Sequence, residues 1–92
     1  MHTDNEIEQN SILHESIMEI LDNQIKNNDP PKTKEIFDRL IEQCISKKEV
    51  RRLIGCVIAA EIYDIMKNQQ SFNQERYIQR LNRLPEMPWA ND

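Results

Sequence analysis

Apolar residues recur at intervals of three and four along most of the chain, the spacing that places side chains on one helical face. Four such segments lie at about residues 10–27, 31–45, 47–68 and 73–84, and none shows the alternation typical of a half-buried strand. The pattern predicts an all-α protein, a compact bundle of about four helices. The apolar faces of the first two segments are Leu13, Ile17, Ile20, Leu21 and Ile25, and then Ile36, Phe37, Leu40, Ile41, Cys44 and Ile45.

Helix-ending and helix-capping residues separate the four segments. Residues 27–31 read Asn-Asn-Asp-Pro-Pro, which ends the first helix and starts the second, because proline fits only the first turn of a helix. Ser46 and Glu49 have the spacing of a capping box, so we expect the third helix to begin there. Asn73 is a good N-cap for the fourth helix, and Pro85 ends it.

The third segment is the most apolar of the four. Between Leu53 and Ala60 apolar residues occupy nearly its whole circumference, so we expect this helix to be central and the most buried. Gly55, the only glycine in the chain, lies inside it, where glycine costs about 0.5–1 kcal/mol relative to alanine. A close approach of a second helix accounts for glycine at this position. We therefore predict a helix crossing at Gly55.

The chain divides into a polar N-terminal extension at residues 1–9, a single helical domain at 10–84 and an extended tail at 85–92. Thr3 and Glu6 have capping-box spacing, which allows an earlier helical turn within the extension. The tail holds the only tryptophan, Trp89, and aromatic side chains on short extended segments often dock into grooves. Trp89 is therefore a candidate partner contact, with packing against its own helices as the commoner alternative.

Composition narrows the function classes. One glycine leaves no glycine-rich phosphate loop, and no run of about 18 apolar residues is present to span a membrane. The polar, acidic start differs from the basic and apolar start of a signal peptide, so we expect a cytoplasmic protein. Cys44 and Cys56 are too far apart on a helical hairpin for a disulfide, and we expect two reduced, buried thiols.

Charge is distributed unevenly along the chain. The net charge is −4, with −6 in residues 1–46 and +2 in residues 47–92, and this balance disfavours nucleic acid as a partner. We expect the basic side chains to pair with carboxylates of the first helix, within the chain or across a dimer, with nucleic-acid binding as the weaker alternative. The basic residues are Lys47, Lys48, Arg51, Arg52, Arg76, Arg80 and Arg83, of which the last three are candidate partner contacts; the carboxylates are Glu8, Glu15, Glu19 and Asp22.

His14 begins the only stretch that resembles a metal-binding helix. The sequence His14-Glu15-Ser16-Ile17-Met18 has the spacing of a zinc-binding helix, but Met18 occupies the place of the second histidine ligand. A thioether does not replace imidazole at a catalytic zinc site. We therefore expect no metal site and no cofactor, and His14 stays only a weak metal candidate.

Glu61 is expected on the inward face of the most buried helix. A buried carboxylate needs a proton or a cationic partner, and His14, Arg39 and Arg52 are the candidates. We expect a structural ion pair between Arg52 and Glu61. A degenerate metal or acid–base site that joins His14 and Glu61 is the alternative, and no catalytic residue is assigned.

Several stretches of the chain, taken in order, resemble a known pattern. They are His14 through Asn23-Gln24, Asp29-Pro30-Pro31, Leu53-Ile54-Gly55, Glu61-Ile62-Tyr63 and Phe72 through Tyr77. Over about residues 10–84 they resemble a family of small, uncharacterised bacterial all-helical domains. The resemblance implies a helical fold and no established activity. Of the family's four histidine positions the chain keeps His14, while Met18, Lys48 and Arg52 occupy the others, so any metal bound there by relatives is expected to be lost.

The sequence as a whole favours a non-enzymatic protein–protein interaction module, with a homodimer as one form of it. The reasons are the small core expected of 92 residues, the apolar third helix and the oppositely charged halves. A catalytic site and a nucleic-acid interface remain as the alternatives given above.

Overall fold

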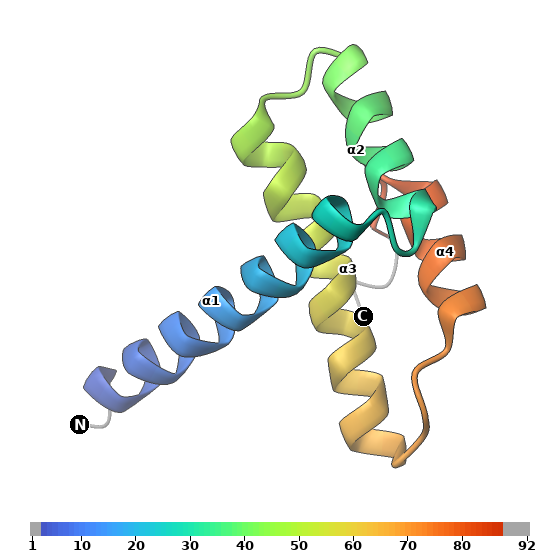
Figure 1. Ribbon diagram of the computed structural model, residues 1–92. Coiled ribbons are helices and arrows are strands. Elements are labelled where there is room, and N and C mark those ends of the chain that lie inside the picture. The colour runs from blue at the N-terminus through green and yellow to red at the C-terminus, as the bar shows by residue number, and fades with distance from the viewer. Residues whose placement is uncertain (1–2, 88–92) are drawn as a thin grey trace.

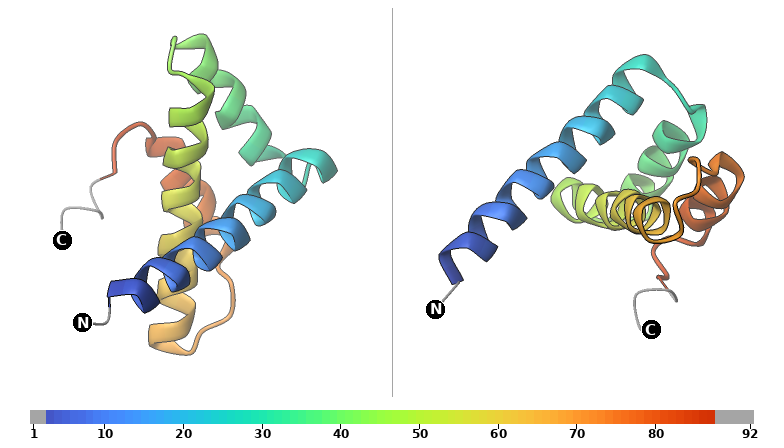
Figure 2. Two further views of the ribbon diagram at one scale, coloured as in Figure 1. Left: turned by 90° about the vertical axis from the view of Figure 1, so that its left-hand side faces the viewer. Right: turned by 90° about the horizontal axis from the view of Figure 1, so that it is seen from below.

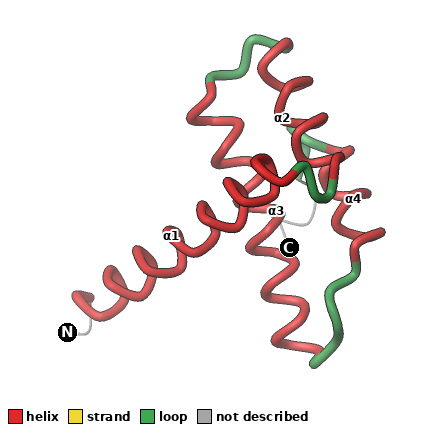
Figure 3. Tube along the Cα trace, viewed as in Figure 1, coloured by secondary structure: helices red, strands yellow, loops and turns green. Residues whose placement is uncertain are grey.

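Four helices form the protein in its computed structural model, which describes the backbone of residues 3–87 and the side chains of residues 13–87. They are α1 (Thr3–Asn27), α2 (Pro31–Glu42), α3 (Lys47–Asn68) and α4 (Gln74–Arg83), and no strand occurs in the described range (Figures 1 and 3). The predicted all-α bundle is confirmed. No helix within these residues has the length and apolar character needed to cross a membrane.

The third helix is the centre of the arrangement. It contacts α1, α2 and α4, and seen from below it lies between α1 and α4 (Figure 2). α2 and α3 run in opposite directions, joined by a short connection, while the N-terminal half of α1 extends away from the other helices (Figure 1). The core residues are Ile17, Leu21, Ile36, Leu40, Val50, Leu53, Ile54, Val57, Ile58, Tyr77, Leu81 and Leu84.

The predicted starts of α3 and α4 are confirmed by their capping hydrogen bonds. Ser46 Oγ accepts a hydrogen bond from the Glu49 amide at 3.2 Å, and α3 begins at Lys47, directly after Ser46. Asn73 Oδ1 accepts one from the Arg76 amide at 3.0 Å at the start of α4. These side chains satisfy first-turn amides that have no partner inside the helix.

Two boundary predictions differ from the structure. The first helix begins at Thr3 and not near Asn10, because residues 3–9 hold neither proline nor glycine and the helix continues through them. α2 ends at Glu42, and Cys44 adopts a positive φ of 66° in the connection to α3. Cys44 is therefore exposed and Cys56 half-buried, so the expectation of two buried thiols is wrong, while both are free as predicted.

Gly55 lies where α1 crosses α3. A β-carbon built at this position would come within 2.7 Å of Met18 Cε and 3.5 Å of Ile17 Cγ2, both on α1. Contacts below 3.0 Å are essentially absent from real structures, so only glycine allows this approach without movement of Met18. The predicted close crossing is found, and α1 is the second helix.

A polar cluster ties the far end of α1 to α2 and α4. Gln24 Oε1 accepts hydrogen bonds from Thr33 Oγ1 and from Tyr77 Oη, each at 2.7 Å. Thr33 is fully buried and Tyr77 is 1% exposed, so these bonds satisfy groups that water does not reach. Burial raises the pKa of the Tyr77 hydroxyl above its ordinary value, partly offset by its bonds to Thr33 and Gln24.

This raised pKa predicts a loss of stability in alkaline solution. A group whose pKa is higher in the folded state contributes stability below its unfolded pKa, about 10 for tyrosine, and loses it as the pH rises through the folded pKa. The free energy of unfolding should therefore fall above about pH 10, by up to about 1.4 kcal/mol per pH unit for one proton.

Urea unfolding between neutral and strongly alkaline pH measures this effect. Tyr77→Phe should remove most of the additional slope. Tyr63→Phe is the control, because Tyr63 is the other tyrosine of the chain and its side chain is 61% exposed. Equal alkaline slopes in the two variants would contradict the role given to Tyr77.

Candidate functional site

Four exposed apolar side chains lie on α1, on the C-terminal half of α3 and in the connection between α3 and α4. Met66 is 75% exposed, Phe72 49%, Leu13 48% and Ile20 36%. Leu13 lies two helical turns before Ile20, which places both on one face of α1. We call these four residues, together with the groove that Ile20 and Phe72 line, the apolar face.

The groove of the apolar face has a volume of about 240 Å³. It lies between α1, α3 and the start of α4, and it remains open because α1 crosses α3 at Gly55 instead of packing along its length. The residues that line it are Ile20, Gln24, Ile58, Glu61, Ile62, Ile65, Phe72 and Tyr77. Scattered apolar residues are ordinary on a surface, but a groove with apolar rims is typical of a binding site.

Glu61 lines this groove and is the most buried charged residue among the described residues. Its side chain is 3% exposed, and both carboxylate oxygens accept from Arg76 Nε, at 3.2 and 3.1 Å. Arg80 Nη1 donates to Oε2 at 2.6 Å, and Asp64 lies 2.9 Å from the same nitrogen. The hydrogen bonds that Arg76 donates to Glu61 raise the pKa of the Arg76 guanidinium above its ordinary value.

The expected ion pair between Arg52 and Glu61 is wrong. Arg52 instead forms a two-bond contact with Glu49, at 2.8 and 2.6 Å. Arg52 and Glu61 are nine positions apart on the same helix. This spacing corresponds to about 14 Å along the helix axis and about two and a half turns, so the two side chains point in opposite directions. Arg76 and Arg80, one turn apart on α4, form ion pairs with Glu61. Their four-residue spacing places both on one face of α4, and this was the sequence feature that could have indicated them as partners of a buried carboxylate.

The basic residues expected to meet a partner differ in their availability. Arg76 and Arg80 are 25% and 19% exposed and hold Glu61, so they fix α4 to α3. Arg83 is exposed. The pairing of basic side chains within the chain is found, but for α4 the carboxylates come from α3 rather than from α1. Trp89 lies outside the described residues.

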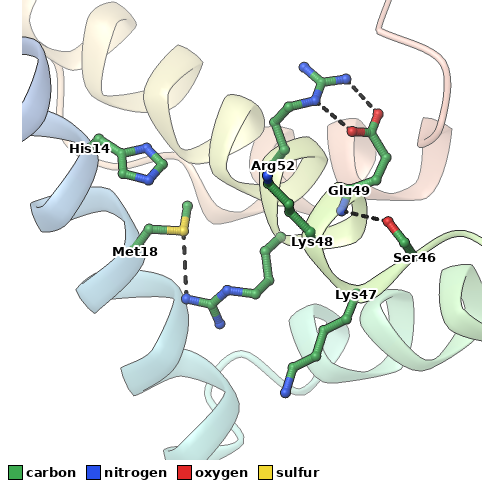
Figure 4. A pocket seen from close by; sticks show the side chains of 8 residues that line it. His14, Met18, Ser46, Lys47, Lys48, Glu49 and Arg52 are labelled. Carbon is green, nitrogen blue, oxygen red and sulfur yellow. Dashed lines mark hydrogen bonds and ion pairs between the residues drawn. The ribbon is translucent and has the colours of Figure 1, made fainter.

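A second cavity lies on the other side of the α1–α3 crossing, at the start of α3. It has a volume of about 580 Å³ and is lined by both helices (Figure 4). We call it the basic pocket, because four of its residues are cationic. Its lining is His14, Met18, Ser46, Lys47, Lys48, Glu49, Arg51 and Arg52.

Two of the four cations in the basic pocket are held by carboxylates. Arg51 donates to both oxygens of Asp22, at 2.6 and 3.4 Å, and its hydrogen bonds lower the pKa of that carboxyl. Arg52 lowers the pKa of Glu49 in the same way. Arg51 Nη2 also approaches Met18 Sδ at 3.6 Å, so the α1 wall of the pocket is fixed to α3.

His14 and Glu61 do not share a site. His14 lines the basic pocket beside the first turns of α3, whereas Glu61 lines the groove on the far side of the crossing and is held by α4. Within the described residues no three histidine, cysteine or acidic side chains are placed to hold one metal ion. The geometry instead brings His14, Met18, Lys48 and Arg52 together in the lining of the basic pocket.

The basic pocket is lined by residues of α1 and of the start of α3, which are distant in the sequence. The spacing of the residues alone does not join His14 to the basic run at 47–52; the crossing at Gly55 places them side by side. Comparisons of the chain with protein families, with characterised proteins and with solved structures found no match.

Proposed function

We propose that this protein is a non-enzymatic protein–protein interaction module that associates with a second copy of itself through the apolar face. A cytoplasmic location and kinship with the small bacterial helical domains described above are part of the same proposal. They rest on the sequence features already given.

The observation that carries the proposal is the concentration of exposed apolar side chains around one groove. Phe72 lines a cavity whose walls also include Ile62 and Ile65 of α3 and Ile20 of α1. Met66 lies one helical turn after Ile62 on α3 and is 75% exposed. Burial of such side chains in an interface removes apolar surface from water at about 25 cal/mol per Å². By contrast, Ile41 on α2 is exposed alone, as single apolar residues on ordinary surfaces are.

We propose a second copy of the chain as the partner of the apolar face, because this face has both projecting side chains and a groove. In a two-fold dimer the same patch meets itself, so each projecting side chain of one copy faces the groove of the other. Phe72 and Met66 are the projecting side chains, and Ile62 and Ile65 line the groove. A chain of 92 residues has a small core, and association adds buried apolar area to it.

Met66→Glu tests this proposal with little risk to the fold, because the Met66 side chain is 75% exposed. Sedimentation velocity from low to high micromolar concentration should show the wild-type mass rising from 11.0 kDa towards the dimer. Met66→Glu should weaken association at least about tenfold, since each copy then buries an unpaired carboxylate.

Gln79→Glu is the matched control. It adds the same charge at an exposed position on α4, away from the apolar face, and should associate as the wild type does. A wild-type protein that stays monomeric throughout the range, or equal weakening by both variants, would contradict the proposal.

A further inference from the structure

The basic pocket combines two kinds of wall. Met18 and the methylene stems of Lys48 and Arg51 are apolar, and the imidazole of His14 adds a flat ring with a hydrogen-bonding edge (Figure 4). Lys47, Lys48 and Arg52 contribute positive charges to the lining, and Figure 4 shows their side chains extending in different directions from the start of α3. Such a lining suits a ligand that is charged at one end and apolar at the other.

The charges of the pocket are only half balanced. Asp22 holds Arg51, and Glu49 holds Arg52. No carboxylate among residues 13–87 forms an ion pair with Lys47 or Lys48, although Lys47 helps to lower the pKa of Asp22 from a distance. Among the described side chains, the positive charges of Lys47 and Lys48 are thus not paired with a carboxylate.

We propose that the basic pocket binds a soluble phosphate monoester with an apolar or aromatic organic part. Near neutral pH a phosphate monoester carries a charge of about −1.5 to −2, which two uncompensated lysines can balance. Carboxylates carry a single charge and would leave one lysine without a counter-ion. The organic part lies against Met18 and the ring of His14.

The dimensions of the pocket support an organic phosphate rather than the bare ion. Its volume of about 580 Å³ lies within the usual range of small-molecule sites, about 300–1,000 Å³. A phosphate group alone would fill a small part of it and would leave Met18 exposed to water. The pocket and the apolar face lie on opposite sides of the crossing at Gly55, so this proposal is independent of self-association.

Phenyl phosphate, titrated at low ionic strength and followed through the methionine methyl groups by NMR, tests the proposal. The methyl signal of Met18, in the pocket wall, should shift with saturation, whereas that of Met66, on the apolar face, should not. Inorganic phosphate should bind at least about tenfold more weakly, and phenol should produce no saturable shift. A titration without a saturable Met18 shift, or with equal shifts at Met66, would overturn the proposal.

A pair of charge-matched variants separates a site from general attraction of anions. Lys47→Gln with Lys48→Gln should lower the affinity for phenyl phosphate at least about tenfold. Lys26→Gln with Lys67→Gln removes the same charge at exposed positions outside the pocket and should leave the affinity within about twofold of the wild type. Equal losses in the two double variants would contradict the proposal.

Lipid headgroups also carry phosphate monoesters, so a further experiment tests whether the protein binds vesicles that contain phosphatidic acid. We expect no sedimentation of the protein with these vesicles under conditions where phenyl phosphate binds. Binding to the vesicles without a Met18 response to phenyl phosphate would overturn the assignment to a soluble ligand.

Discussion

Glu61→Gln is expected to lower the free energy of unfolding by about 2–3 kcal/mol, the largest effect of any polar substitution in the described structure. The Glu61 carboxylate is almost fully buried and accepts from Arg76 and Arg80. Loss of one partner of a buried ion pair commonly costs about 3–5 kcal/mol. Asp64 remains beside Arg80, and both arginines retain some contact with water, so the lower figure applies here.

Equilibrium urea unfolding measures this change, and Glu49→Gln is the control. Glu49 forms a two-bond contact with Arg52 much like the one between Glu61 and Arg76, but on the exposed surface. Exposed pairs contribute little, so this control should unfold almost as the wild type does. If the two glutamine variants are equally stable, burial of the Glu61 cluster has no energetic importance and this part of the account is wrong.

Gly55→Leu is expected to destabilise the protein by about 1–3 kcal/mol, because the added side chain meets α1 where the two helices cross. Gly55→Ala should stay within about 1 kcal/mol of the wild type. Its β-carbon displaces only the mobile end of Met18, and alanine has the better helix propensity by about 1 kcal/mol. Thermal unfolding of the two variants measures the difference.

A second substitution tests whether Met18 causes the conflict. Met18→Ala in the Gly55→Leu background should restore part of the lost stability, since it frees space at the point of contact. In the wild-type background Met18→Ala should only destabilise, because it leaves an unfilled gap. A Gly55→Leu protein as stable as the wild type would show that α1 does not approach α3 closely at this point.

Much of the fold follows from local signals in the sequence. The capping residues Ser46 and Asn73 place the starts of α3 and α4 where the structure has them, since each satisfies an amide of its own helix. Gly55 is also a local signal, because a glycine inside a helix indicates the close approach of another helix. The main start of the first helix was placed too late, near Asn10, because the polar segment before it has no apolar periodicity to mark it. The capping-box spacing of Thr3 and Glu6, which allows an earlier turn, was the signal for the start at Thr3.

The candidate sites were less accessible to sequence reasoning, because they depend on how helices meet. Apolar periodicity places Ile20 and Met66 on the inward faces of their helices, but α1 diverges from α3 beyond the crossing and leaves them exposed. The partner of Glu61 required the placement of α4, although helix geometry alone excludes Arg52. The periodicity of one helix therefore shows which side chains share a face, but it does not show which faces are left exposed by the packing of the other helices.

The crossing at Gly55 relates the two candidate surfaces. The basic pocket lies beside residues 46–52 of α3, and the apolar groove lies beside residues 58–65 of the same helix. A substitution that moves α1, such as Gly55→Leu, should therefore disturb both surfaces at once. Met66→Glu and the double lysine variant should each disturb only one.

The central claim is that the apolar face of one copy meets the apolar face of another. Isotope-filtered NMR on a mixture of labelled and unlabelled protein tests it most directly, because it detects contacts between different copies only. We expect intermolecular contacts from the Met66 methyl group to the Phe72 ring and to Ile20 or Ile62. An absence of intermolecular contacts at concentrations where the sedimenting mass is that of a dimer, or contacts at Ile41 on α2 instead, would contradict it.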